Sequence, residues 1–353
     1  MDASLQTRIE QLLARYRRER GGSVAETARG VLELSAMFNG RVPLRRGYLA
    51  SRRLRRAYVH YYLPANAEKI LRVLREMDAY APPGRPLRVL DFGCGPGTAT
   101  IALLASGRPV SELWLVDVVD EALDDAEFFA RALGASPRRA HEPPPGPFDL
   151  VLAAHVLSET DARLETLVAE DGYLVVVEPA LRGAARRLME WRDRRAAEGF
   201  RIAAPCLGEA PCPMLEHPDL WCHMDVPWAR PSWIAEVDRR TGLSKESLKY
   251  AYAVLTRRGR TLADAAGRPC RRVVSNLHRE KGKAWAWTCA PGSPLCRVEV
   301  LARRRGPETR DFFHARRGDL LRLETAGTAA RPEGPVRAVR PGASSFTEPP
   351  PPV

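Results

Sequence analysis

A glycine-rich turn at residues 91–98, with the sequence DFGCGPGT, constrains the fold more than any other segment of the chain. It follows the hydrophobic run LRVL and precedes an apolar helical pattern at 98–106. Glycines at alternate positions let the backbone turn sharply and approach a ligand closely. A buried strand, a tight turn and a helix in this order predict the first unit of a parallel sheet.

The same alternation of strand and helix continues to about residue 200, which predicts an α/β fold with a doubly wound sheet over residues 85–200. The expected elements are a strand at 113–118, a helix at 121–133, a loop at 141–147, a strand from 148, a strand at 172–180 and a charged helix at 181–199.

The turn also predicts a nucleotide-like cofactor. Asp117 ends the second expected strand, 26 residues after Asp91, where a carboxylate can accept hydrogen bonds from ribose hydroxyls. Dinucleotide-binding enzymes use G-x-G-x-x-G, whereas this chain has D-x-G-x-G-x-G. The latter resembles the first motif of class I S-adenosylmethionine-dependent methyltransferases. This resemblance implies a cofactor site made by Asp91, Gly93, Gly95, Gly97 and Asp117.

Catalytic residues are harder to assign from the sequence. Methyltransferases that act on base amino groups often carry N/D-P-P-Y/F/W after the fourth strand, and this chain has Ala-Ala-His-Val at 153–156. No cysteine stands there to attack a pyrimidine ring. His155 and Glu159 are candidate bases, although a structural role fits each of them better, so the catalytic residues stay unassigned.

The charge distribution predicts contact with nucleic acid. The chain has a net charge of +12, of which residues 1–80 carry +8, residues 81–200 carry −6 and residues 251–320 carry +10. Two basic flanks around an acidic centre suit a phosphate backbone, with an affinity that falls as salt rises. The N-terminus has no apolar signal core, and no apolar run reaches the ~18 residues of a membrane helix. We therefore expect a cytoplasmic protein.

Four regions are expected along the chain. Residues 1–80 read as a helical N-terminal region, in which Ser23 caps a helix over 24–38 and Pro64 starts a helix to about 77. The cofactor-binding core covers 85–200. A cysteine-rich loop and basic antiparallel strands cover 201–325. The Pro-, Ala- and Gly-rich tail at 326–353 is expected to be disordered.

Three of the seven cysteines lie close together in a loop that prolines keep from becoming helical. They are Cys206, Cys212 and Cys222. Clustered cysteines in a cytoplasmic chain indicate metal binding rather than disulfides. Cys289 is the first choice for a fourth ligand, and the alternatives are Cys270, Cys296, His217 and His223. Four thiolates can hold zinc or a [4Fe–4S] cluster, and the wide spacing without C-x2-C pairs favours the cluster.

Several segments together resemble the mitochondrial ribosomal small-subunit methyltransferase-like protein family, which has bacterial members. These segments are AYVHYYLPANAEKI at 57–70, LDFGCGPGTATIAL at 90–103, LVVVEPALRGAARRLMEWRD at 174–193, the C-x5-C-P and WCH motifs at 206–223, and SLKYAYAVLTRR at 247–258. The resemblance covers about residues 25–320. It implies that Cys206, Cys212, Cys222 and Cys289 hold an iron–sulfur cluster.

The family resemblance also implies a role in assembly of the small ribosomal subunit or in translation, with the subunit and its rRNA as partners. We expect a protein that is monomeric away from the ribosome. Two hypotheses follow from the missing catalytic motif. The first is a methyltransferase that modifies rRNA, and the second is a non-catalytic assembly factor with a degenerate methyltransferase fold and a structural zinc site.

Overall fold

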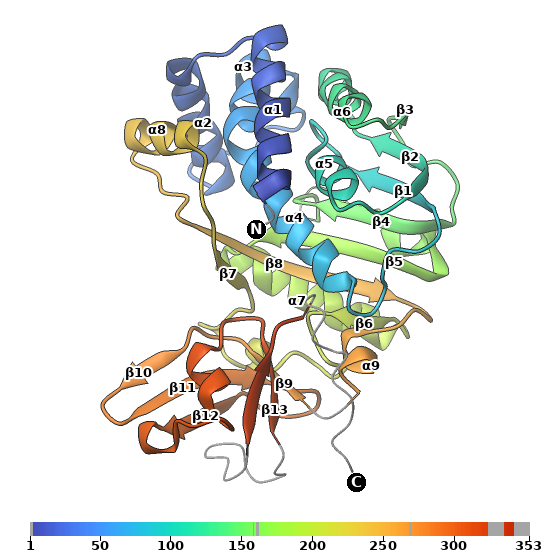
Figure 1. Ribbon diagram of the computed structural model, residues 1–353. Helices are drawn as coiled ribbons and strands as arrows, with labels where there is room; N and C mark the ends of the chain where they lie inside the picture. The colour runs from blue at the N-terminus through green and yellow to red at the C-terminus, as the bar shows by residue number, and fades with distance from the viewer. Residues whose placement is uncertain (1–2, 158, 160–161, 268–269, 324–334, 342–353) are drawn as a thin grey trace. The chain divides into compact units, whose positions relative to one another are not determined.

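The computed structural model describes residues 3–157, 159, 162–267, 270–323 and 335–341 (Figure 1). The chain forms two compact units. The first comprises Met1–Leu74, Pro83–Ala169 and Pro227–Leu248, and the second comprises Arg75–Pro82, Glu170–Val226 and Lys249–Val353. Among the described residues, every helix is too short or too polar to cross a membrane.

The first unit contains four parallel strands in the order β3-β2-β1-β4. Their bounds are β1 Leu87–Phe92, β2 Val110–Val116, β3 Arg138–Ala140 and β4 Phe148–Ala154. The central strand β1 places Asp91 beside Leu115 of β2 and Leu152 of β4. The predicted parallel α/β arrangement is thus confirmed, while the short edge strand β3 was not predicted because its three residues carry no apolar pattern.

Two helices follow the first two strands, as the sequence predicts. They are α5 (Thr98–Ala105), which is apolar and almost wholly buried, and α6 (Asp120–Ala132), which packs beside it. A short 3₁₀ turn, η3 (Leu164–Leu167), comes after β4.

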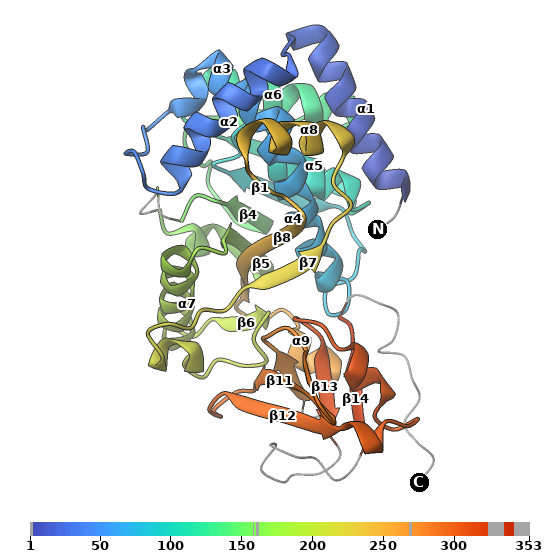
Figure 2. The same ribbon diagram turned by 90° about the vertical axis from the view of Figure 1, so that its left-hand side faces the viewer.

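The N-terminal part of the first unit is helical. It consists of α1 (Ala3–Arg20), α2 (Val24–Phe38), η1 (Tyr48–Ala50), α3 (Arg52–Ala57), η2 (Tyr58–Tyr62) and α4 (Leu63–Met77). Ser23 caps α2 as predicted, and Glu26 completes a capping box with it. α8 (Ser232–Thr241) comes from much later in the chain but packs on α2, as two views show (Figures 1 and 2).

The predicted helix from Pro64 to about residue 77 is confirmed as α4, which begins at Leu63, but Pro64 does not mark the start of the helical segment. The chain is already helical from Arg52, and η2 is a π-helical segment in which Leu63 N–H bonds to the carbonyl of Tyr58. Proline has no N–H and its ring clashes with the carbonyl four residues earlier in a regular α-helix. A wider π turn directly before Pro64 moves that carbonyl, so the helix continues without a break.

The second unit begins with an antiparallel set of strands in which β8 pairs with both β5 and β6, and also with β7. Their bounds are β5 Val168–Pro179, β6 Arg201–Ala204, β7 Met224–Pro227 and β8 Ser247–Thr256. The predicted charged helix is α7 (Arg182–Ala197), and the 3₁₀ turn η4 (Pro213–Glu216) interrupts the cysteine-rich loop. A short helix, α9 (Leu262–Ala266), follows β8.

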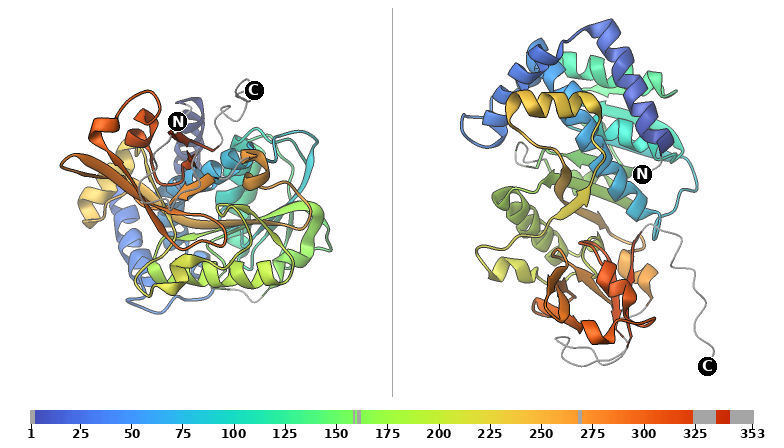
Figure 3. Two further views of the ribbon diagram at one scale, coloured as in Figure 1. Left: turned by 90° about the horizontal axis from the view of Figure 1, so that it is seen from below. Right: turned by 60° about the vertical axis from the view of Figure 1, so that its left-hand side comes forward.

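A second sheet fills the rest of this unit and has its own apolar core. Its order is β10-β11-β9-β13-β14, with β12 also pairing with β11, and all pairings are antiparallel as predicted (Figure 3, orange to red). Val273, Ala286, Val298, Phe312 and Leu321 are central to the core. The bounds are β9 Cys270–Val273, β10 His278–Glu280, β11 Lys283–Cys289, β12 Cys296–Leu301, η5 Ala302–Arg304, η6 Arg310–His314, β13 Leu320–Leu323 and β14 Val336–Val339.

The expectation of a disordered tail is wrong for part of residues 326–353. Val336–Val339 form β14, which pairs with β13, and the buried side chain of Val336 joins the core. One sheet edge is enough to order four residues whose composition alone predicts disorder. Residues 326–334 and 342–353 lie outside the described part of the chain.

Candidate cofactor and metal sites

The three glycines of the turn all adopt left-handed backbone conformations, with φ values of 62° at Gly93, 49° at Gly95 and 86° at Gly97. A Cβ at Gly93 would lie 2.3 Å from Cγ1 of Val156, and one at Gly97 would lie 2.9 Å from Cα of Ala126. Those two glycines are therefore needed for packing. A Cβ at Gly95 would meet only Cδ1 of Leu49 at 3.4 Å, so Gly95 faces the open side of the turn.

Asp91 is buried and serves the turn itself. Its Oδ2 accepts hydrogen bonds from the N–H of Thr100 at 2.9 Å and from Oγ1 of Thr100 at 2.6 Å. Burial raises the pKa of Asp91 to about 7, although the bonds from Thr100 oppose that rise. The carboxyl group thus ties the first turn of α5 to the end of β1 and supports the glycine turn between them.

Asp117 stands on the open side, directly after β2. Its Oδ2 accepts a hydrogen bond from Gly95 N–H at 2.8 Å, and its Oδ1 accepts one from Val119 N–H at 3.0 Å. Burial raises its pKa, and the backbone N–H bonds from Gly95 and Val119 counteract this. The two predicted halves of a ribose site, the glycine turn and the carboxylate, are therefore in direct contact.

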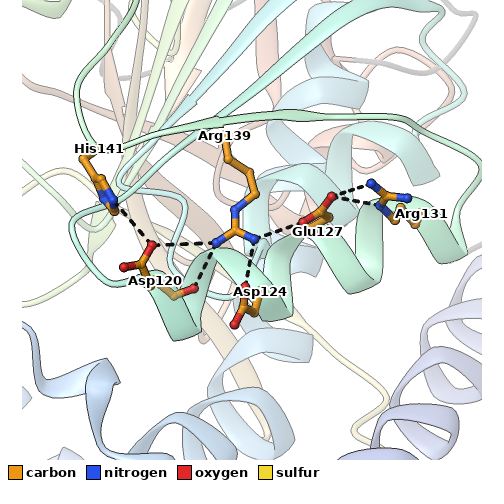
Figure 4. Close-up of polar contacts among 6 residues, drawn as sticks. All are labelled: Asp120, Asp124, Glu127, Arg131, Arg139 and His141. Carbon is orange, nitrogen blue, oxygen red and sulfur yellow. Dashed lines mark hydrogen bonds and ion pairs between the residues drawn. The ribbon is translucent and has the colours of Figure 1, made fainter.

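Polar side chains after Asp117 hold the neighbouring edge of the sheet (Figure 4). Arg139 of β3 bridges two carboxylates of α6, Asp124 at 2.8 Å and Glu127 at 3.1 Å. Nδ1 of His141 lies 3.0 Å from the carbonyl oxygen of Asp117. The ion pairs of Arg139 join β3 to α6, and His141 contacts the carbonyl oxygen of Asp117. These contacts fix the backbone of Asp117 between the two elements.

The N-terminal helices close over the same region, which the sequence did not reveal. Asp125 of α6 accepts a hydrogen bond from Tyr16 of α1 at 2.8 Å and forms an ion pair with Arg55 of α3 at 2.9 Å. Asp125 is 1% exposed, so this pair is internal. Arg55 belongs to the basic flank at residues 1–80 that was expected to contact nucleic acid. It instead joins α3 to α6, while Arg52 and Arg53 are exposed.

His155 directly follows β4 and is the one non-glycine residue with positive φ, 63°, in the described part of the chain. Its Nε2 is buried and has no hydrogen-bond partner among the described residues. Burial, and then the positive charges of Lys69 and Lys245, lower the pKa of His155 to about 3. The imidazole is neutral at pH 7 and is a weak base.

In the second unit, four cysteines line one cavity: Cys206, Cys212, Cys222 and Cys289. Burial, and then the thiols of Cys206 and Cys289, raise the pKa of Cys222 to about 12. Burial, and then Cys206 and Cys212, raise the pKa of Cys289 to about 12 in the same way. The four thiols are thus near enough to influence one another, although they come from positions up to 83 residues apart in the sequence.

Two buried arginines line the same cavity. Arg272 pairs with Glu76 through both guanidinium nitrogens, at 2.7 and 3.1 Å, and Arg192 donates to the carbonyl of Ala210 at 2.7 Å in the cysteine-rich loop. Their positive charges oppose the rise in thiol pKa that burial causes: Arg272 lowers the pKa of Cys222, and Arg192 lowers the pKa of Cys289. Thiolate, the form that binds a metal, is favoured by such neighbours.

The other candidate ligands are placed differently. His223 also lines the cavity, whereas Cys270, Cys296 and His217 do not. Within the described residues, no group of three or more His, Cys, Asp or Glu side chains is arranged to hold a metal ion. The four thiols therefore share a cavity without forming the compact set that a single ion requires.

Comparison with known proteins identifies the family. Residues 52–322, more than three quarters of the chain, match the family model described as mitochondrial small ribosomal subunit Rsm22. The chain belongs to the Rsm22 family. This confirms the family resemblance expected from the sequence motifs. Among curated proteins, no significant match to this Rsm22 family member is found.

Solved structures resemble the chain only distantly. A ribosomal protein L11 methylase from Lactobacillus delbrueckii subsp. bulgaricus shares 23% identity over 38% of this chain and 69% of its own, with a TM-score of 0.30. The YcgJ protein from Bacillus subtilis shares 16% sequence identity over 54% of this chain and 100% of its own, with a TM-score of 0.34. A protein described as a putative RNA methyltransferase from Pyrococcus horikoshii shares 13% sequence identity over 56% of this chain and 86% of its own, with a TM-score of 0.34. These scores are too low to carry an argument about this member of the Rsm22 family.

Proposed function

We propose that this Rsm22 family member is a cofactor-binding factor of the small ribosomal subunit, and that S-adenosylmethionine binds at the glycine turn. The observation that carries the cofactor assignment is the 2.8 Å contact between Gly95 N–H and Asp117. It brings the carboxylate of Asp117 against Gly95, the glycine of the turn whose Cβ position meets only Leu49 Cδ1 at 3.4 Å. The residues that would hold the cofactor are Gly93, Gly95, Gly97 and Asp117, with Asp91 supporting the turn.

We further propose that Cys206, Cys212, Cys222 and Cys289 hold a [4Fe–4S] cluster. Support comes from the shared cavity and from the buried arginines, which favour thiolates and offset the negative charge that four of them bring. Zinc is the alternative, with four thiolates at about 2.3 Å from one ion. The wide spacing of these cysteines in the sequence, without C-x2-C pairs, is the reason to prefer the cluster.

The proposed partner is the small ribosomal subunit, which the description of the family names. The basic flanks at residues 1–80 and 251–320 give a physical reason for binding to rRNA. We propose a cytoplasmic protein that is monomeric away from the ribosome. None of these points requires methyl transfer.

A non-catalytic role is the second candidate, and the state of His155 favours it. A general base works best when its pKa lies near the working pH, and the pKa of His155 is lowered to about 3. S-adenosylmethionine supplies an activated methyl group when bound, but His155 would be slow to accept the proton that methylation of an amino group releases. In that case the described residues around the end of β4 would bind the cofactor and help to hold the fold, but would not catalyse methyl transfer.

Transfer of a tritiated methyl group to purified small subunits separates the two candidates. A methyltransferase labels rRNA stoichiometrically with the wild-type protein and not with Gly95→Asp. A non-catalytic factor binds the cofactor and the subunit but leaves the rRNA unlabelled.

A further inference from the structure

The strand β11 places two tryptophans on its outer face. Its side chains alternate between Ala284, Ala286 and Thr288, which are at most 1% exposed, and Trp285 and Trp287 on the opposite side. Trp287 is 41% exposed and is among the most exposed large apolar residues described. The core is complete without these two rings, because the alanines already fill it.

Side chains from β10 and β12, the two strands that pair with β11 on this side of the sheet, pack around Trp285. The His278 ring lies on Trp285 at 4.0 Å between centroids and an angle of 11°. The guanidinium carbon of Arg297 lies 4.3 Å from the centre of the Trp285 ring, and the ring of Trp287 is 6.4 Å from that of Trp285 at 86°. The Trp285 ring is thus covered by an imidazole ring and a cation, while Trp287 remains 41% exposed to solvent.

The charge around this face suits a polyanion. Residues 278–305 carry seven Arg and Lys against two Glu. Both glutamates are engaged: Glu299 with Lys283 at 2.9 Å and Arg297 at 2.8 Å, and Glu280 with Trp285 Nε1 at 2.6 Å. The exposed cations nearby include Lys281 and Arg303, which can meet phosphates, whereas Arg279 donates a hydrogen bond to the carbonyl oxygen of Phe313.

We propose that the outer face of β11, centred on Trp287, is a platform on which unpaired bases of RNA stack while the surrounding arginines and lysines contact the backbone. Proteins that bind single strands combine these two elements, since every base has an aromatic face and every nucleotide a phosphate. The inference rests on the proposed rRNA partner and gives it a specific contact, an unpaired rather than a helical segment.

The test measures binding of the full-length protein to a labelled ten-nucleotide oligouridine and to a ten-base-pair RNA duplex by fluorescence anisotropy at one salt concentration. Stacking is worth about 1–3 kcal/mol per base, and 1.4 kcal/mol is tenfold, so Trp287→Ala should weaken oligouridine binding about tenfold. Duplex binding should stay unchanged. Trp287→Phe, which keeps an aromatic face, should stay within about threefold of wild type.

Trp114→Ala is the matched control. Trp114 also lies under an arginine, with Arg138 at 5.5 Å, but it belongs to β2 in the first unit. The Trp114→Ala variant should bind oligouridine with the affinity of the wild type. Equal oligouridine binding by Trp287→Ala and wild type would overturn the platform while leaving the ribosomal role intact. If wild type bound neither RNA nor small subunits, the proposed function itself would fail.

Discussion

Gly95→Asp separates cofactor binding from folding. The fold should tolerate it, because a Cβ at Gly95 meets only Leu49 Cδ1 at 3.4 Å and aspartate is one of the residues that visit left-handed backbone conformations. The backbone conformation should cost about 1 kcal/mol of stability, the lower end of the penalty for such a conformation, and repulsion by Asp117 adds to this cost unless one carboxylate turns away or takes a proton.

The effect on S-adenosylmethionine should be much larger. Gly95 N–H lies 2.8 Å from Asp117 Oδ2, so a carboxylate at position 95 comes within about 5 Å of the one at 117. At that distance and an effective dielectric constant of about 20, the two repel by roughly 3 kcal/mol. One of them must turn away or take a proton, which removes the ribose acceptor. Affinity should therefore fall at least ~100-fold.

Isothermal titration calorimetry with S-adenosylmethionine, paired with urea unfolding, is the assay. Gly95→Ala is the matched control, since it brings the same backbone strain without charge, and it should keep affinity within about tenfold. Gly97→Ala should instead unfold more readily, because its Cβ would lie 2.9 Å from the backbone of Ala126. Affinity of Gly95→Asp within threefold of wild type would show that the cofactor site lies elsewhere.

Three further predictions concern the metal, a buried acid and the basic flank. Replacing any one of the four cavity cysteines by serine should remove the iron, about four atoms per chain, and the absorption near ~400 nm from anaerobically purified protein; these are Cys206, Cys212, Cys222 and Cys289. The control variants Cys94→Ser and Cys296→Ser should keep both. Iron retained in all four cavity variants would refute the site. The pKa of Asp91 is raised to about 7 in the folded protein from 3.8, so the neutral form is stabilised and its contribution is lost as pH rises from about 4 to about 7. Relative to wild type, Asp91→Asn should gain about 2–3 kcal/mol in free energy of unfolding between pH 5 and pH 8, measured by urea unfolding, and equal pH profiles would contradict the burial argument. Arg52→Glu with Arg53→Glu should weaken binding to small-subunit rRNA and reduce its salt dependence at a stability cost of about 1 kcal/mol or less, because the ion pair of Arg53 with Glu33 lies at the surface. Arg55→Glu should instead separate α3 from Asp125 at a cost of about 3–5 kcal/mol. Binding that does not change with salt would mean that the flank does not contact phosphates.

Local patterns explain why much of the first unit could be predicted from the sequence. The run before Asp91, the turn and the apolar helix after it are short-range features, and each is where it was expected. The capping of α2 by Ser23 is equally local. The π turn before Pro64 was missed because a proline at that place normally begins a helix rather than continuing one.

Long-range contacts account for the features that the sequence did not reveal. Nothing near residue 232 indicates that α8 packs on α2, and nothing near Arg55 indicates that a buried carboxylate on α6 takes its charge. Arg272 and Arg192 beside the cysteines look like ordinary members of an arginine-rich chain until Glu76 and the loop carbonyls are seen around them. These arginines become structural because they are buried among charged and polar partners. Those partners lie far along the chain, so the local sequence does not show the burial.

Sedimentation of the purified protein with isolated ribosomal subunits tests the central claim most directly. The protein, prepared without oxygen and mixed with S-adenosylmethionine, is layered with small or large subunits on sucrose gradients at low and at moderate salt. We predict about one copy on each small subunit at low salt, release as salt rises, and none on the large subunit. Equal amounts on both subunits, or none on the small subunit at low salt, would contradict the assignment to the small ribosomal subunit.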